Sequence, residues 1–221
     1  DVIRLVAEDA SVPDLNRPEP GRAGFQPGQT AEQQALVADI VRTGQGRRRR
    51  PLVITADRGR GKSAALGIAA ARLLESGRKR VLVTAPSADN VATLFAHARQ
   101  ELGDALAMDT PTQLTTRSGH ELCFLPPQEL LSQRPEAEVV LVDEAAGLPA
   151  QWLKAVLLGW PRVVFASTVH GYEGTGRGFA LRFRQILEQE TPHWRAVSVR
   201  EPIRWAEGDP LERLIFQLYL L

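Results

Sequence analysis

Short apolar segments alternate with longer amphipathic segments along most of the chain. The short segments are β-branched and apolar at consecutive positions, and they lie at 52–55, 81–84, 139–142 and 163–167. Apolar residues recur at helical spacing in the longer segments, at 62–76, 88–102 and 178–190. Strands that are apolar on both faces are typical of a parallel sheet whose crossover helices cover both sides. The pattern therefore predicts an α/β fold with three layers and a mostly parallel central sheet.

The part of the chain before these strands has two different compositions. Residues 1–28 contain four prolines and three glycines, which favours a linker over regular structure. Apolar residues then recur at helical spacing over 30–41, with Thr30 in the place of an N-cap, and a basic turn follows over 45–50. We therefore expect a linker from a preceding domain over 1–28 and one folded module over 29–221.

Two later stretches are less regular. Residues 103–135 contain one strand-like run, 121–125, and a further run lies at 196–199. The chain starts at Asp1 rather than Met and stops in an apolar, helix-like stretch over 214–221. We therefore expect it to be part of a longer protein.

Composition agrees with one soluble domain. The chain has 221 residues, of which 43% are hydrophobic and 24% are charged, an ordinary balance for a globular protein. It contains no run of about 18 apolar residues and no basic-then-apolar start, which predicts a cytoplasmic protein with no membrane contact. The single cysteine, Cys123, excludes an internal disulfide and is expected to be a buried core thiol. The four histidines are too scattered to indicate zinc.

The formal net charge of the chain is only +1. Any contact with nucleic acid must therefore come from a local basic patch rather than from the overall field. One such patch is the run of four arginines at 47–50. Two interpretations remain open for it, a solvated loop or a contact for RNA phosphate.

A phosphate-binding loop lies between the first strand-like segment and the first long helical segment. Residues 56–63 read Ala-Asp-Arg-Gly-Arg-Gly-Lys-Ser, which is the P-loop pattern with Ala in place of its first Gly. A loop that leaves a buried strand and opens a helix presents backbone N–H groups to an anion. The candidate nucleotide-binding residues are Asp57, Arg58, Gly59, Arg60, Gly61, Lys62 and Ser63.

Within this loop, Lys62 is expected to reach the β- and γ-phosphates, and the Ser63 hydroxyl is expected to coordinate Mg²⁺. The alternative is a Gly-rich turn that merely joins strand to helix. Gln33, 29 residues before Lys62, stands where helicase-like ATPases read the adenine edge, and a solvent-facing helix glutamine is an equally good interpretation.

Two carboxylates follow the apolar segment 139–142. Asp143 at the carboxyl end of a strand near the P-loop is a candidate Mg²⁺ ligand, and Glu144 is the candidate general base for the attacking water. Helix capping is the alternative for this pair. Ser167 and Thr168 end the next strand-like segment, where their hydroxyls would sense the γ-phosphate or cap a turn.

Two arginines are candidates for stabilising charge on the γ-phosphoryl group. Arg177 lies in a stretch with four glycines over 171–178, which we interpret as a mobile or sharply turned loop. Arg204 follows the strand-like run at 196–199. Either arginine could act on the phosphates, or it could be a surface ion-pair partner.

Four of these segments together resemble the tRNA(Met) cytidine acetyltransferases. Two of them, Thr-Ala-Asp-Arg-Gly-Arg-Gly-Lys-Ser at 55–63 and Val-Asp-Glu-Ala-Ala at 142–146, fit many ATPases. The other two are long and unusual: Thr-Val-His-Gly-Tyr-Glu-Gly-Thr-Gly-Arg-Gly-Phe at 168–179 and Glu-Pro-Ile-Arg-Trp-Ala-Glu-Gly-Asp-Pro-Leu-Glu at 201–212. Their order and spacing match the family.

The resemblance implies a RecD-like, RecA-type P-loop ATPase module that hydrolyses ATP or GTP with Mg²⁺. The parent enzyme of such a module uses acetyl-CoA to form N4-acetylcytidine at the wobble position of elongator tRNA(Met). The family combines this module with an acetyltransferase domain, before which the chain stops, so acetyl-CoA would not bind here. By the same resemblance the nucleotide-binding positions are Gln33, residues 57–63 and one of the arginines, with Arg177 favoured over Arg204.

Two other functions fit parts of the pattern, namely a RecD-like DNA helicase fragment and a nucleotide-binding module that no longer hydrolyses. A helicase normally needs a second RecA-like domain, for which 221 residues leave no room. The presence of both Asp143 and Glu144 argues against loss of hydrolysis.

Overall fold

The computed structural model describes residues 31–57, 59–168 and 175–199, with the backbone alone for 175–180. Its centre is an eight-stranded sheet in the order β3-β4-β5-β2-β6-β7-β1-β8. The strands are β1 (Leu52–Ala56), β2 (Arg80–Thr84), β3 (Leu106–Thr110), β4 (Gln113–Thr116), β5 (Glu121–Phe124), β6 (Val139–Val142), β7 (Val163–Thr168) and β8 (Arg195–Val199).

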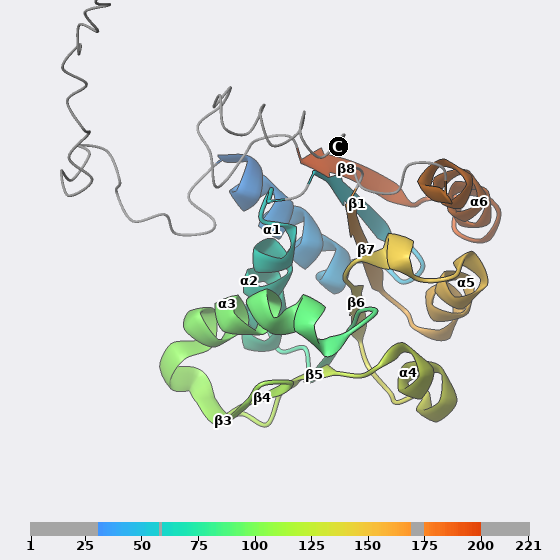
Figure 1. Cartoon of the computed structure of the whole chain (residues 1–221). Coiled ribbons are helices and arrows are strands. Elements are labelled where there is room, and N and C mark those ends of the chain that lie inside the picture. Colours follow the sequence, from blue (N-terminus) through green and yellow to red (C-terminus); the bar gives the residue numbers. More distant parts are fainter. Residues whose placement is uncertain (1–30, 58, 169–174, 200–221) are drawn as a thin grey trace, which may run out of the picture.

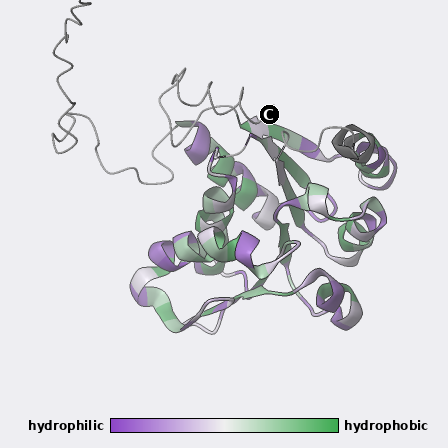
Figure 2. Ribbon diagram, in the orientation of Figure 1, coloured by the Kyte–Doolittle hydropathy of each residue, from purple (hydrophilic) through white to green (hydrophobic). Residues whose placement is uncertain are grey.

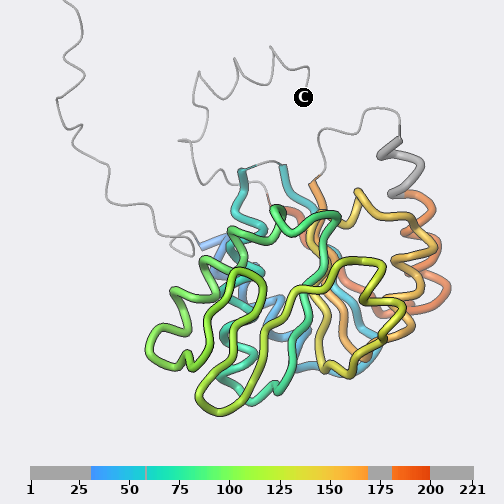
Figure 3. The backbone as a smooth tube through the Cα atoms, turned by 60° about the horizontal axis from the view of Figure 1, so that its bottom comes forward, coloured from blue at the N-terminus to red at the C-terminus, as the bar shows by residue number. Residues whose placement is uncertain are grey.

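Six neighbouring strands, from β5 to β8 in the sheet order, run parallel. Their common direction gives the sheet two distinct edges. We call the edge where these strands begin the amino edge and the edge where they end the carboxyl edge. Among the described strands, β4 alone runs in the opposite direction, because it pairs antiparallel with both β5 and β3, and the β3–β4 hairpin continues the sheet beyond β5. Figure 3 shows this hairpin, in green to yellow-green, at the margin of the molecule beside α3 (Ala92–Leu102).

Helices cover both faces of the sheet, which makes three layers (Figure 1). On one face lie α1 (Ala31–Gln45), α2 (Lys62–Glu75) and α3, and on the other lie α4 (Pro127–Gln133), α5 (Ala150–Gly159) and α6 (Thr175–Glu190). Short 3₁₀ turns occur at Ala88–Val91, Gly103–Ala105 and Ala145–Gly147. Each face has its own hydrophobic core, and Figure 2 shows the strands between them as mainly hydrophobic.

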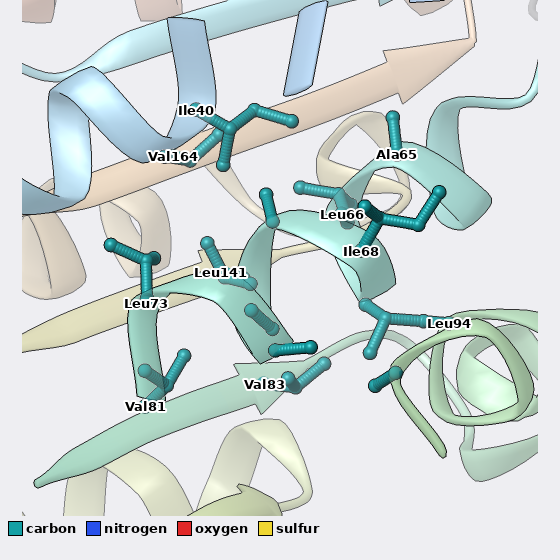
Figure 4. Packing of buried hydrophobic residues seen from close by; sticks show 14 of the residues in the cluster. Ile40, Ala65, Leu66, Ile68, Leu73, Val81, Val83, Leu94, Leu141 and Val164 are labelled. Atoms are coloured by element: carbon teal, nitrogen blue, oxygen red, sulfur yellow. The ribbon is translucent and has the colours of Figure 1, made fainter. Parts of the chain in front are cut away.

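Helix α2 is the centre of the larger core. Its Leu66 and Leu73 lie over the sheet, between Ile40 of α1 and Leu94 of α3 (Figure 4). The two helices α2 and α3 approach so closely at Gly67 that a Cβ there would lie 2.1 Å from the carbonyl oxygen of Leu94. This position therefore requires glycine, and its close approach fixes α2, and with it the loop before α2, against the rest of the core.

The described elements confirm the predicted α/β fold and its mostly parallel sheet. The strand-like segments at 52–55, 81–84, 121–125, 139–142, 163–167 and 196–199 all contain strands, with bounds that shift by one residue at some ends. In the stretch 103–135, however, β3, β4 and α4 were not predicted. Strand β3 is mostly exposed, so it lacks the apolar alternation on which strand prediction depends.

Two helix bounds also differ from the prediction. The first helix extends to Gln45, so the basic turn begins one residue later than expected. Helix α6 begins at Thr175, so the last glycines of the stretch 171–178 belong to a helix rather than to a loop.

Cys123 is half-buried against the smaller core rather than fully buried, and burial raises the pKa of its thiol. No described helix is long and apolar enough to span a membrane.

A candidate nucleotide-binding and hydrolysis site

The P-loop leaves β1 at the carboxyl edge and opens α2. Gly59 and Gly61 have φ angles of 83° and 71°, in the left-handed region where a side chain would be strained. The carbonyl of Gly61 accepts a 2.9 Å hydrogen bond from the N–H of Ala65, which starts the helix. Lys62 and Ser63 are the first two residues of α2. The sequence motif is therefore placed at a helix N-terminus, as phosphate binding requires.

Lys62 lies between the two carboxylates that follow β6. Its Nζ is 2.7 Å from Glu144 Oε1 and 3.3 Å from Asp143 Oδ1. The lysine is 7% exposed and Asp143 is 0% exposed, so these charges are largely removed from water. Burial by itself lowers the pKa of Lys62, but the two carboxylates outweigh it and raise the pKa above its ordinary value. The lysine therefore remains a cation at neutral pH.

Ser63 adds a hydroxyl to the same cluster. Its Oγ donates a 2.6 Å hydrogen bond to Asp143 Oδ2. A hydroxyl and a carboxylate side by side are hard oxygen donors, and Mg²⁺ is usually held by one or two such groups together with substrate phosphates and water. These two residues thus fit the expected Mg²⁺ role. Among the described residues no group of three or more His, Cys, Asp or Glu could hold a metal ion.

Glu144 is held from both sides. Thr168, at the end of β7, donates from Oγ1 to both carboxylate oxygens, at 3.1 Å and 3.0 Å. Lys62 contacts Oε1 from the other side. The backbone of Glu144 is left-handed, with φ 48° and ψ 46°, and its N–H donates to Asp143 Oδ1 at 2.9 Å. Such a conformation is uncommon for a residue other than glycine and is typical of functional positions.

The alternative interpretation of this carboxylate pair as helix caps is wrong. No side chain caps the following turn Ala145–Gly147. Asp143 and Glu144 instead contact Lys62, Ser63 and Thr168. The contact between Thr168 and Glu144 was not foreseen, because Thr168 was expected to sense phosphate or cap a turn. Only the sheet order, which places β7 beside β6, brings these two residues together.

The structure describes some of the remaining predicted nucleotide-binding residues and leaves others outside its described part. Gln33 is 2% exposed, so the solvent-facing interpretation is wrong, and its adenine contact stays a prediction. Arg60 is 8% exposed and forms a 3.9 Å ion pair with Asp57. Arg177 belongs to the first turn of α6, with its side chain outside the described part. The other two predicted site residues, Arg58 and Arg204, lie outside the described residues.

Comparison with known families identifies the chain. The family model described as RNA cytidine acetyltransferase NAT10/TcmA, helicase domain, matches residues 53–221. The chain belongs to this family. The match includes the P-loop, the two carboxylates and the segment that contains Arg177 and Arg204.

Curated relatives in this family are tRNA(Met) cytidine acetyltransferases named TmcA. The protein of Nitrosococcus halophilus is 47% identical over 206 residues, which cover 93% of this chain and 27% of the relative. The Vibrio cholerae protein is 46% identical over 190 residues, covering 86% and 26% respectively. The chain thus spans about a quarter of the length of these relatives.

Solved structures with the same fold are P-loop ATPases. The large terminase of a thermophilic bacteriophage, in complex with ATP-gamma-S, gives a TM-score of 0.56 at 9% identity, over 85% of this chain and 48% of the terminase. The Pif1 helicase of Candida albicans gives a TM-score of 0.50 at 15% identity, over 86% of this chain and 43% of the helicase. At such identities the likeness concerns the fold alone, and it confirms the P-loop NTPase architecture.

Proposed function

We propose that this chain is the ATP- or GTP-hydrolysing module of an enzyme that forms N4-acetylcytidine at the wobble position of elongator tRNA(Met) from acetyl-CoA. The names of its relatives support the reaction of the whole enzyme. The role of the module is supported by one observation above all. Lys62 of the P-loop is held by Asp143 and Glu144, so the phosphate-binding cation and the hydrolytic carboxylates form one cluster.

Nucleotide binding would rearrange this cluster. A triphosphate on the P-loop offers Lys62 more negative charge than the carboxylates do, so the lysine exchanges Glu144 for the β- and γ-phosphates. Ser63 and Asp143 would hold Mg²⁺, which neutralises charge on the phosphate oxygens. Loss of the lysine contact leaves Glu144 without a cation partner, held by Thr168 alone, and this is the state in which it would act as a base.

Hydrolysis would then proceed by in-line attack of water. Glu144 accepts a proton as the water oxygen bonds to the γ-phosphorus and the bond to the leaving diphosphate breaks. Thr168 keeps the carboxylate in place during this step, because it binds both oxygens independently of Lys62. Arg177 is our first candidate for stabilising the charge that develops on the phosphoryl oxygens, and Arg204 is the second.

The domain organisation belongs to the same proposal. We propose a linker from a preceding domain over 1–28, which lies outside the described residues, and the ATPase module over 29–221, ahead of an acetyltransferase domain of the parent enzyme. The chain alone is expected to bind Mg-ATP and to transfer no acetyl group. Labelled acetyl-CoA, ATP and elongator tRNA(Met) are incubated with the chain and with the full-length parent. Acetylcytidine made by the chain would contradict the domain boundaries, and none made by the parent would contradict the reaction.

Replacement of Glu144 by Gln tests the hydrolytic role directly. The variant keeps the size and one acceptor oxygen but cannot take a proton, so hydrolysis should fall about a hundredfold while Mg-ATP binding stays near normal. Phosphate release and binding of a fluorescent ATP analogue measure the two effects. Glu188→Gln is the matched control, because Glu188 is an exposed glutamate paired with Arg184 on α6. Weaker binding with unchanged turnover would make Glu144 a structural residue instead.

The alternative function as a DNA helicase fragment predicts that a different nucleic acid stimulates ATP hydrolysis. Single-stranded DNA would stimulate hydrolysis by a RecD-like helicase fragment, whereas tRNA would stimulate the module proposed here. Binding of ATP without hydrolysis by the unmodified chain, in the presence of tRNA as well as in its absence, would favour the remaining alternative, a nucleotide-binding module that no longer hydrolyses.

A further inference from the structure

A second concentration of charge lies at the amino edge of the sheet, at the opposite end of the strands from the P-loop. The residues that precede or open β1, β2 and β7 are almost all basic there. This set, which we call the basic edge, consists of Arg47, Arg48, Arg49, Arg50, Arg78, Lys79, Arg80 and Arg162. Because β1 has five residues, the basic edge and the P-loop are separated by about 16 Å of strand.

Hydrogen bonds to backbone carbonyls join these residues into one surface. Arg162 Nε donates to the carbonyl of Gly46 at 2.7 Å, and the N–H of Arg49 donates to the carbonyl of Pro161 at 2.8 Å. Arg78 donates to the carbonyl of Gln45 at 3.2 Å. The turn after α1 is thereby fixed against the starts of β2 and β7. The proximity of Arg78 and Arg48, after burial, lowers the pKa of Arg162, as expected when like charges are neighbours.

Negative charge on this surface does not balance the positive charge. Glu138 pairs with Arg78 and Glu121 pairs with Arg80, so six of the eight basic residues have no carboxylate partner there. Glu136, which also precedes β6, is exposed, so three glutamates stand against eight basic residues. The four arginines of the turn, at 47–50, are exposed, and none of them forms an ion pair with a described residue. The whole chain has a net charge of only +1, so this local excess is not part of a generally basic surface.

The backbone of Arg49 is in an unfavourable conformation for an arginine. Its φ of 59° is left-handed, where glycine or asparagine is favoured and a larger side chain is strained. The fold would therefore be at least as stable with glycine at this position. An arginine at this position therefore adds positive charge to the surface at some expense of backbone strain.

The composition of the surface favours a nucleic acid over a protein partner. Protein interfaces have an apolar centre, whereas nucleic-acid interfaces are polar and strongly basic. The exposed large hydrophobic residues of the described chain are Met108, Leu158 and Leu181, and none belongs to the basic edge. We propose that the basic edge binds the phosphate backbone of the RNA substrate, opposite the nucleotide site and without competing with ATP. This inference rests on the proposed function, which supplies RNA as the substrate.

The test compares charge removal at the basic edge with equal charge removal elsewhere. The double variant Arg47→Ser/Arg48→Ser should weaken binding of labelled tRNA about tenfold near 0.1 M salt and reduce the slope of log K against log salt by about 2. The matched control Arg182→Ser/Arg184→Ser removes two exposed arginines from α6. Fluorescence anisotropy at several salt concentrations gives both quantities. Fluorescent ATP binding is measured on every sample and should not change.

Arg49→Gly separates contact with RNA from support of the fold. It should weaken tRNA binding severalfold while the melting temperature stays equal or rises, since a strained conformation is relieved. A lower melting temperature with unchanged RNA binding would overturn the inference and make Arg49 structural.

Three further results would overturn the inference. They are equal losses in the basic-edge and α6 variants, no measurable tRNA binding by the unmodified chain, and displacement of tRNA by polyglutamate at equal charge concentration, which would indicate an acidic protein segment as the partner. In each case intact ATP binding and hydrolysis would leave the proposed function standing.

Discussion

The two ends of the same parallel strands carry positive charge in opposite ways. At the carboxyl edge Lys62 is buried and lies between two carboxylates, so its charge is matched locally. At the amino edge the arginines at 47–50 are exposed, and their charge is not matched by described neighbours. A buried cation must have a partner because desolvation is costly, whereas an exposed one remains hydrated and needs none.

This difference predicts two kinds of anion recognition. On the proposed function, Lys62 at the carboxyl edge gives up its contact with Glu144 only for an anion that fits the P-loop and carries more charge than the carboxylates, so we expect this site to be selective. The amino edge is open to any polyanion and is screened by salt, since exposed charges interact only within a Debye length of about 8–10 Å. We therefore expect selective anion binding where the positive charge is buried and salt-dependent attraction of a nucleic-acid backbone where it is exposed.

The largest effect is expected when the buried lysine of the carboxyl edge is removed. Lys62→Ala should reduce hydrolysis more than a hundredfold and weaken ATP binding, because the phosphates lose their main cation. The melting temperature should fall, since two carboxylates then face one another without the lysine, but the chain should still fold. Phosphate release and circular dichroism measure these outcomes. Lys154→Ala, which removes an ion pair with Glu190 outside the site, is the control and should leave turnover unchanged.

A smaller effect is expected from the hydroxyl that holds Glu144. Thr168→Val keeps the shape of the side chain but removes both hydrogen bonds to the carboxylate. Hydrolysis should fall about tenfold with ATP binding unchanged, which corresponds to roughly 1.4 kcal/mol and is typical of a lost hydrogen bond to a charged group. Thr110→Val, whose hydroxyl bonds to the backbone of Gln113, is the matched control. Equal rates in the two variants would exclude a positioning role for Thr168.

The smallest effect concerns the amino edge and depends on pH. Burial alone would raise the pKa of Glu138, but hydrogen bonds from the backbone of Lys79 and Arg80 and from the side chain of Arg78 lower it below 4.5. The carboxylate therefore stabilises the fold at pH values above 4.5, and this contribution disappears as the pH falls through the lowered pKa.

Glu138→Gln should cost less than about 1 kcal/mol at pH 7, because the ion pair is partly exposed. The difference from the unmodified chain should vanish in acid. Urea unfolding at pH 7 and near pH 3 measures it. The variant should also bind tRNA slightly more tightly, as it removes a negative charge from the basic edge. A stability difference that grew in acid would contradict the assigned direction of the pKa shift.

The buried strands and the P-loop were predictable because their signals are local. A strand that is apolar at every position, such as 139–142, and a loop with Gly59, Gly61 and Lys62 need no knowledge of distant residues. The hairpin of β3 and β4 was not predictable in the same way. Its outer strand is mostly exposed and shows no alternation of apolar and polar residues, so only pairing through β4 with β5 makes it part of the sheet.

In the site, too, the local signals were predictable and the long-range contacts were not. The sequence indicated four site residues one by one, because each follows the end of a predicted strand. They are Lys62, Ser63, Asp143 and Glu144. Their mutual contacts depend on the order β6-β7-β1, which brings residues about 80 positions apart to within hydrogen-bond distance. The contact of Thr168 with Glu144 had no local signal at all, since a threonine at a strand end has many ordinary roles.

By itself the sequence determined the alternation of buried strands and helices, the phosphate loop and the resemblance to a family. These properties depend on residue type and spacing within short segments. Tertiary structure alone decided which charges are paired and which stay exposed. Lys62 and Arg49 are both basic residues near β1, but one is buried between carboxylates and the other is exposed in a left-handed turn. The energy of a charge depends on its surroundings, and the fold assembles those surroundings from distant parts of the chain.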